Sequence, residues 1–134
     1  MSHNITLTDV RIKDMGLLKN IVQQMSEGKA SLVNPASNFR TYRGQPTGCD
    51  AKIEMPGPHD VGFKRNVDGS FSPVFDPYQM DQVFQAPGGH NRIGGLLREY
   101  ALQEAEYEAA QRGFTAQRVE GQNGVITLEL VAAS

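Results

Sequence analysis

Two turn signals constrain the fold of this chain more than any other feature of its sequence. Each is a dipeptide set between stretches in which apolar and polar residues alternate: Asp68-Gly69 between residues 61–67 and 70–75, and Asn123-Gly124 between residues 115–120 and 125–131. Both dipeptides favour tight β-turns whose two central residues adopt positive φ angles. In the last stretch, Ile126, Leu128 and Leu130 fall on one face of a strand. The sequence therefore predicts two antiparallel hairpins, the second at the C-terminal end.

Two other stretches carry apolar residues at helical spacing. The first follows Asp14, a good N-cap residue, and stops at Gly28. Its apolar stripe consists of Met15, Leu18, Ile21, Val22 and Met25. The second is predicted to begin at Asn91 and to stop at Arg112-Gly113-Phe114, where Phe114 would make a closing hydrophobic contact. Its stripe consists of Ile93, Leu96, Leu97, Tyr100, Ala101 and Ala105, with Tyr107 or Ala109 as alternative extensions.

The remaining patterns complete an α+β fold. Residues 5–12, with a bulge where the alternation changes parity, and residues 51–55 are predicted strands. The Pro- and Gly-containing segment 34–48 reads as irregular or as a short strand, and residues 76–90 as a long loop. We expect a mainly antiparallel sheet of about six strands with two helices packed on one face, in strand-helix-strands-helix-hairpin order. Because no linker is visible, residues 1–134 are predicted to form a single domain.

Charge and cysteine content narrow the class of protein. The formal net charge is −2, so the chain has no overall basic footprint for nucleic acid or an anionic membrane. The single cysteine, Cys49, excludes an internal disulfide and a multi-cysteine metal cage. The start of the chain lacks the pattern of a signal peptide, and no apolar run is long enough to cross a membrane. These features predict a cytoplasmic protein, or a stromal one in a plastid.

The candidate partner surface comes from the irregular segments at residues 34–48 and 76–92. It consists of Arg40, Tyr42, Arg43, Tyr78, Asn91 and Arg92. The chain encodes a core but no paired catalytic groups, and we therefore expect a non-enzymatic binding or adaptor protein that acts through a protein partner. Two hairpins also leave sheet edges exposed, which makes a homo-oligomer an alternative assembly.

Two other classes of function stay open. Nucleic acid, a nucleotide or another anion could bind basic residues interleaved with aromatic ones, together with a glycine-rich helix start. The residues of this reading are Arg40, Arg43, Lys64 and Arg65 with Phe39, Tyr42 and Phe63, and an anion loop at Gly88, Gly89 and His90. A solvated sheet face with buried aromatics, and an ordinary loop with a helix cap, explain the same residues without a ligand. An enzyme would need a site assembled from dispersed residues, namely His59, Asp60, Lys64, Asp76 and His90. The three histidines lack metal-ligand spacing, so we expect no metal and no cofactor.

Several segments together resemble one family. They are Met1-Ser2-His3, Asp60-Val61-Gly62-Phe63-Lys64 with Asp68-Gly69-Ser70, Arg98-Glu99-Tyr100-Ala101, Gln111-Arg112-Gly113-Phe114 and the closing Asn-Gly hairpin. In order and spacing they resemble the ycf-thirty-five-like proteins of algal plastids and cyanobacteria, which are also grouped as a domain of unknown function. The resemblance implies a small α+β protein and no catalytic residues. The chain has no Trp, and its segments 34–48 and 76–90 differ from typical members, which suits a divergent bacterial or phage-borne homologue.

Overall fold

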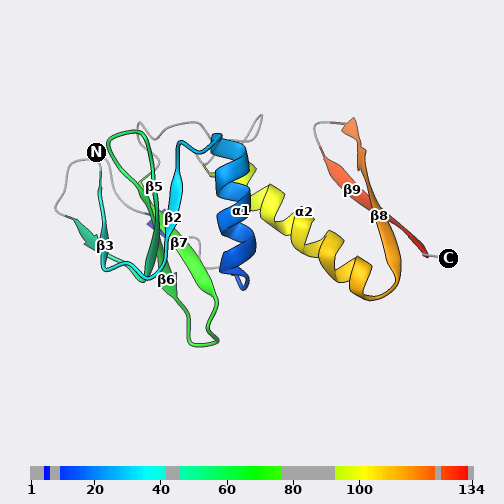
Figure 1. Ribbon diagram of the computed structural model, residues 1–134, viewed down its shortest axis with the longest axis horizontal. Coiled ribbons are helices and arrows are strands. Elements are labelled where there is room, and N and C mark those ends of the chain that lie inside the picture. Colours follow the sequence, from blue (N-terminus) through cyan, green and yellow to red (C-terminus); the bar gives the residue numbers. More distant parts are fainter. Residues whose placement is uncertain (1–4, 7–9, 42–45, 77–92, 123–124, 133–134) are drawn as a thin grey trace.

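The computed structural model describes residues 5–6, 10–41, 46–76, 93–122 and 125–132 (Figure 1). Two helices are present in these residues, α1 (Met15–Ser26) and α2 (Gly94–Gln111). The strands are β1 (Ile5–Thr6), β2 (Ser31–Val33), β3 (Asn38–Phe39), β4 (Thr47–Gly48), β5 (Ala51–Glu54), β6 (Val61–Arg65), β7 (Phe71–Phe75), β8 (Phe114–Glu120) and β9 (Ile126–Ala132).

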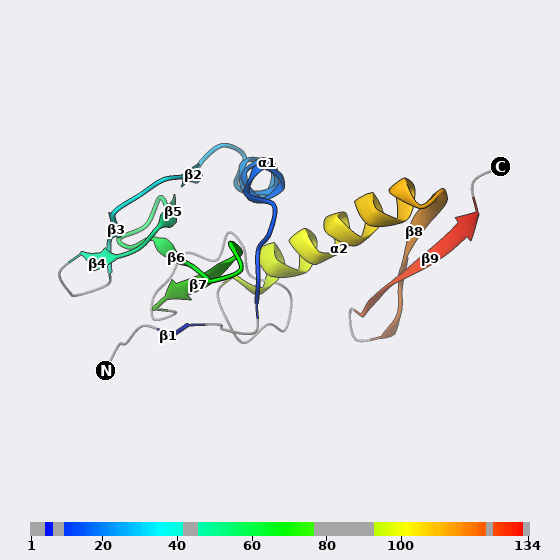
Figure 2. The same cartoon turned by 90° about the horizontal axis from the view of Figure 1, so that it is seen from below.

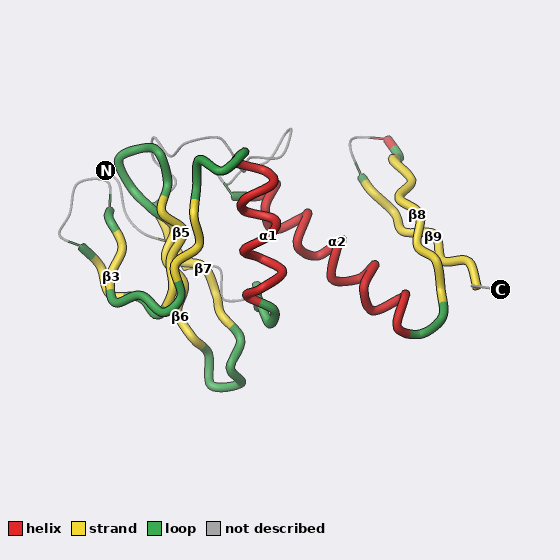
Figure 3. Tube along the Cα trace, in the orientation of Figure 1, coloured by secondary structure: helices red, strands yellow, loops and turns green. Residues whose placement is uncertain are grey.

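The strands belong to three antiparallel sheets. The largest has the order β1-β7-β6-β5-β2, while β3 pairs with β4 and β8 pairs with β9 in two small sheets. All the pairings are antiparallel. The predicted α+β class with a mainly antiparallel sheet and two helices is confirmed, but the C-terminal hairpin does not join the main sheet. Figure 3 shows this hairpin set apart from the other strands by the length of α2.

The main core lies between the five-stranded sheet and the helices. Buried side chains of α1 and of the first turns of α2 pack on β5, β6 and β7: Leu18, Ile21, Val22, Ile93, Leu96 and Tyr100 against Ala51, Ile53, Val61, Phe63 and Phe75. Phe39, Cys49 and Val74 form a second, smaller cluster. Among the described residues, the main cluster contains none beyond Tyr100. The chain after Tyr100 therefore contributes little to this core.

Helix α1 has the predicted ends. The Oδ1 atom of Asp14 accepts a hydrogen bond from the backbone N–H of Leu17 at 2.9 Å, as an N-cap residue does. At the other end, Glu27 and Gly28 both have positive φ angles, and the N–H of Gly28 donates to the carbonyl of Gln23. This left-handed turn stops the helix where the glycine predicts it.

The turn between β6 and β7 is a hairpin, but its geometry differs from the prediction. Only Gly69 has a positive φ angle; Asp68 does not. The N–H of Gly69 donates to the carbonyl of Asn66, and the N–H of Asn66 donates to the carbonyl of Ser70, which makes a five-residue connection. The carboxylate of Asp68 instead accepts hydrogen bonds from the N–H and the hydroxyl of Ser70. Asp68 thus stabilises the turn through its side chain, and the glycine alone takes the left-handed position.

Helix α2 serves two parts of the molecule. Ile93, Leu96 and Tyr100 are buried in the core, but Ala101, Ala105 and Tyr107 of the expected stripe are exposed. Beyond Tyr100 the helix leaves the core and packs against the β8–β9 hairpin instead, so a different face is covered (Figure 1). The predicted stop is confirmed, because Gly113 has a φ angle of 85°. The expected cap Asn91 lies outside the described residues, as do the bulge of the first strand, most of the loop at 76–90 and the Asn123-Gly124 turn.

Candidate interaction surface on a C-terminal arm

Residues 101–132 form a C-terminal arm that extends from the core. It consists of α2 beyond Tyr100 and the β8–β9 hairpin, which folds back along the helix (Figures 1 and 2). The register of the hairpin pairs Ala116 with Leu130, Arg118 with Leu128 and Glu120 with Ile126. Directly opposed residues of an antiparallel pair share one face. Because Arg118 contacts α2, this face is the one turned toward the helix.

Arg118 fastens the hairpin to the helix. Its guanidinium donates two hydrogen bonds to Glu106, through Nε at 2.9 Å and Nη2 at 2.8 Å. It donates two more to Glu99, through Nη1 at 2.9 Å and Nη2 at 2.8 Å. The carboxylates of Glu106 and Glu99 raise the pKa of Arg118, and the hydrogen bonds from Arg118 hold the pKa of Glu99 below its usual value. Such bidentate pairs fix geometry as well as charge.

Tyr100 joins the two helices at the base of the arm. Its hydroxyl accepts hydrogen bonds from the backbone N–H groups of Lys13 and Asp14 and donates one to Glu104 at 2.7 Å. Burial raises the pKa of Tyr100 to about 12, and the hydrogen bond to Glu104 acts in the same direction. The hydroxyl therefore stays protonated at neutral pH and can donate to the carboxylate.

Large apolar side chains are exposed almost entirely on this arm. In the described part of the chain they are Tyr107, Phe114, Val119, Val125, Leu130 and Val131, with exposed fractions from 39% to 63%, and Val67 in the β6–β7 turn. Val119 and Val131 lie on the hairpin face turned away from α2. Phe114 and Leu130 lie on the face turned toward α2, where the single helix does not cover the whole hairpin. Exposed apolar side chains gathered on one part of a molecule mark interaction sites more often than scattered single residues do.

A groove separates the arm from α1. It encloses about 610 Å³ and is lined by Asp14, Leu17, Asn20, Gln103, Glu106, Tyr107 and Arg118. A smaller hollow of about 190 Å³, between the end of α2 and the hairpin, is lined by residues that include Ala109, Phe114 and Leu130. Residues 101–132 carry five glutamates and two arginines, a formal charge of −3. The arm is therefore apolar and acidic at once.

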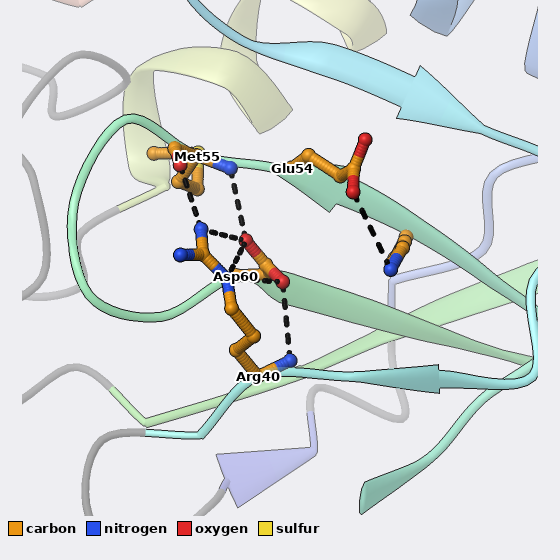
Figure 4. Close-up of polar contacts among 5 residues, drawn as sticks. Arg40, Glu54, Met55 and Asp60 are labelled. Atoms are coloured by element: carbon orange, nitrogen blue, oxygen red, sulfur yellow. Dashed lines mark hydrogen bonds and ion pairs between the residues drawn. The ribbon is translucent and has the colours of Figure 1, made fainter. Parts of the chain in front are cut away.

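Arg40, a predicted partner-binding residue, forms hydrogen bonds and an ion pair within the chain. Its guanidinium donates through Nε and Nη2 to the carboxylate of Asp60, at 2.7 Å for the shortest bond, and through Nη2 to the carbonyl of Met55 (Figure 4). The N–H groups of Arg40 and Met55 donate to the same carboxylate. Burial alone would raise the pKa of Asp60. The hydrogen bonds from the Arg40 guanidinium and from the backbone N–H groups of Met55 and Arg40 instead hold this pKa below its usual value. Arg40 therefore stabilises the fold through Asp60, while 51% of its side chain stays exposed.

The structure does not describe most of the other predicted site residues. Tyr42, Arg43, Tyr78, Asn91 and Arg92, and the anion loop Gly88, Gly89 and His90, lie outside the described residues. Of the basic and aromatic set, Phe39 and Phe63 are buried at 1% and 0% exposure, whereas Lys64 and Arg65 are exposed. Those two rings belong to the core and offer no stacking surface.

The dispersed residues of an enzymatic site are divided between core and surface. His59, Asp60 and Asp76 are buried, Lys64 is exposed and His90 lies outside the described residues. Within the ranges that the structure describes, no group of three His, Cys, Asp or Glu residues is placed to hold a metal ion. None of the pockets described above is lined by His59, Asp60 or Asp76.

Sequence reasoning missed the arm. The signal was present in the closing stretch, where Ile126, Leu128, Leu130 and Val131 accompany a single charged residue, Glu129. Alternation predicted the shared face of Ile126, Leu128 and Leu130, and the register confirms it. What alternation could not reveal is that only one helix covers that face.

Fold and surface together define a small α+β protein with a projecting helix-hairpin arm. Among the described residues, no helix is long and apolar enough to cross a membrane. The chain belongs to DUF1257, a family described as proteins of unknown function, whose family model matches residues 18–129. No curated protein and no solved structure matches the chain.

Proposed function

We propose that this protein is a non-enzymatic binding module that acts through a protein partner held by the C-terminal arm. The observation that carries the proposal is the concentration of exposed apolar side chains between Tyr107 and Val131. Hot spots of protein interfaces are enriched in large side chains such as tyrosine that lie in or beside a pocket. Tyr107, which is 63% exposed and lines the groove next to α1, has this position.

The charge of the arm supports a basic and apolar segment as the partner. An acidic, apolar surface repels nucleic acid and favours a protein segment with apolar side chains flanked by Lys or Arg. Asp14 and Glu106 place carboxylates in the same groove as Leu17 and the ring of Tyr107. A basic side chain of the partner would lie beside Asp14, since Glu106 is already paired with Arg118, while its apolar neighbours cover the ring. The cytoplasmic or stromal location and the likeness to plastid and cyanobacterial proteins belong to this proposal.

Capture of partners by substituted chains tests the proposal. We expect Tyr107→Ser to reduce recovery of a bound protein about thirtyfold, since truncation of a hot-spot residue costs about 2 kcal/mol. Glu108→Lys reverses one charge of the acidic arm and should also reduce recovery of a basic partner. Recovery is measured by quantitative mass spectrometry after nuclease treatment. Val67→Ser is the matched control, because Val67 is fully exposed on the β6–β7 turn, away from the arm. Equal recovery by all four chains would contradict the proposal, and recovery that disappears with nuclease would favour nucleic-acid binding.

A further inference from the structure

Strand β9 is an open sheet edge. In the part of the chain that the structure describes, β9 pairs with β8 along one side and with no other strand. Helix α2 packs mainly on β8 and less on β9. Native proteins protect such edges with Lys, Pro, bulges or glycine kinks. Residues 126–132 contain no Lys, Pro or Gly, and Glu129 is their only charged residue. Apart from Glu129, the sequence of this edge has none of the residues that usually prevent another strand from pairing with it.

The sequence of this strand is nearly symmetric about Leu128. Read outward in both directions, Thr127 faces Glu129, Ile126 faces Leu130 and Val125 faces Val131. Antiparallel pairing of two such strands about a two-fold axis at Leu128 brings these same residues opposite one another. Apolar residues then meet apolar residues, and each Glu129 meets a threonine hydroxyl, so no like charges are opposed.

From this self-complementary edge we infer that β9 pairs with β9 of a second copy of the chain. The two hairpins become one four-stranded sheet with the order β8-β9-β9-β8. A two-fold axis normal to the sheet keeps both α2 helices on the same face. The stripes of Ile126, Leu128 and Leu130 from the two copies then lie side by side between those helices. Leu130, which is 53% exposed in one chain, would be covered.

The inference also accounts for the exposure of Leu130 in a single chain. An isolated two-stranded sheet is only marginally stable in water, whereas a sheet of three or more strands with an apolar face can be stable. The groove with Tyr107 lies on the other side of α2 from the hollow with Leu130, so Tyr107 stays accessible when the two strands pair. A dimer could therefore hold two partners.

Single and double charge substitutions on the hairpin face turned away from α2 test the pairing directly. Thr127 and Glu129 are exposed on the face turned away from α2, so substitutions there leave the helix contacts in place. Thr127→Glu opposes two pairs of like charges across the axis, and we expect the dimer to dissociate roughly tenfold more readily. The double substitution Thr127→Glu with Glu129→Lys pairs opposite charges and should restore the dimer. Light scattering over a range of protein concentrations, at low ionic strength, gives the dissociation constants.

A matched control and a chemical cross-link make the outcome specific. Thr115→Glu adds the same charge on the same face but on β8, where it lies opposite Val131, and should leave the dimer intact. Leu128→Cys places two thiols at the axis, within reach of a disulfide, and should give a covalent dimer on oxidation. Cys49 is buried and does not compete.

Two results would overturn the inference: a wild-type chain that is monomeric at all concentrations, or a dimer that Thr127→Glu does not weaken. A monomer that still captured a partner through Tyr107 would overturn only the inference. A dimer without any captured partner would count only against the proposed function.

Discussion

At the level of single residues, Gly62 shows why the stretch Asp60-Val61-Gly62-Phe63-Lys64 has its composition. Val61 and Phe63 are fully buried in the main core, and Asp60 receives Arg40. A Cβ atom added at Gly62 would overlap the ring of Phe39, which packs directly on the backbone of β6. Packing and hydrogen bonding thus explain the first four residues of this stretch.

This close approach predicts the effect of Gly62→Ala. Phe39 is 1% exposed and has little room to move, so we expect the free energy of unfolding to fall by about 1–3 kcal/mol. Chemical denaturation measures it. Gly48→Ala in the neighbouring β4 is the control, since its Cβ would have only ordinary contacts, the nearest at 3.7 Å. Combining Gly62→Ala with Phe39→Leu should recover part of the loss, and a fully additive double variant would contradict the explanation.

The Asp60 carboxylate predicts a pH-dependent contribution to stability. Its side chain is 1% exposed, whereas that of Arg40 is 51% exposed, so we expect Asp60→Asn to lower the free energy of unfolding by about 2 kcal/mol at pH 7. The pKa of Asp60 is lowered in the folded state, so this stabilisation is present above the unfolded pKa of about 4. It is lost as the pH falls through the lower folded pKa.

Thermal unfolding of both chains between neutral and acidic pH gives the comparison. The difference in the free energy of unfolding between wild type and Asp60→Asn should shrink below pH ~4. Glu54→Gln is the control because the Glu54 carboxylate is 53% exposed and forms an ion pair with Lys52 at 3.5 Å. We expect this control to change the free energy of unfolding by less than about 0.5 kcal/mol. If this difference in the free energy of unfolding were the same at every pH, the charge of Asp60 would not contribute to stability.

At the level of elements, the hairpin depends on α2 through Arg118. Arg118→Ala removes all four hydrogen bonds to Glu99 and Glu106 and leaves two carboxylates close together. We expect amide hydrogen exchange in β8 and β9 to become about tenfold faster, which corresponds to about 1.4 kcal/mol. Exchange in β5 and β6 should not change, because the hairpin lies outside the core. Arg112→Ala removes the same charge from the end of α2 and should leave both regions unaffected.

The elements themselves were largely predictable from local signals. Asp14 marks the start of α1 and Gly28 its end, and Gly113 marks the end of α2. The alternation around Asp68-Gly69 predicts β6 and β7. These signals act within a few residues of the positions they determine. The face of α2 was not predictable beyond Tyr100, because Ala101 and Ala105 continue the periodicity while the partner changes from the core to the hairpin. Helical spacing says which side chains align, not what lies opposite them.

At the level of the whole molecule, the arrangement of the sheets could not be derived from the sequence. Antiparallel pairing followed from the turns, but whether the last hairpin joins the main sheet depends on long-range contacts. For the same reason the arm was not among the sites predicted from the sequence. The segments at 34–48 and 76–92 drew attention through their Arg and Tyr residues, yet Arg40 is held by Asp60. The arm was identified only when exposure could be measured, because Tyr107 and Leu130 are ordinary core residues by type.

The acidic arm predicts opposite responses of its two interactions to salt. A partner rich in Lys or Arg is attracted to a charge of −3, so its binding should weaken as ionic strength rises. Two copies of the arm repel each other, so the dimer should become tighter under the same conditions. Sedimentation velocity with and without the partner measures both. If the two responses have the same sign, one of the two interactions does not involve the arm.

The boundary of the core at Tyr100 has a consequence for how such a chain can change over generations. Substitutions between Ala101 and Ala132 alter a surface without removing contacts from the main cluster, which ends before them. Effects at distant sites without shared contacts add almost independently. New recognition properties can therefore accumulate on the arm while the thermodynamic stability of the core stays near its original value. Substitutions that change what the arm binds need not destabilise the fold.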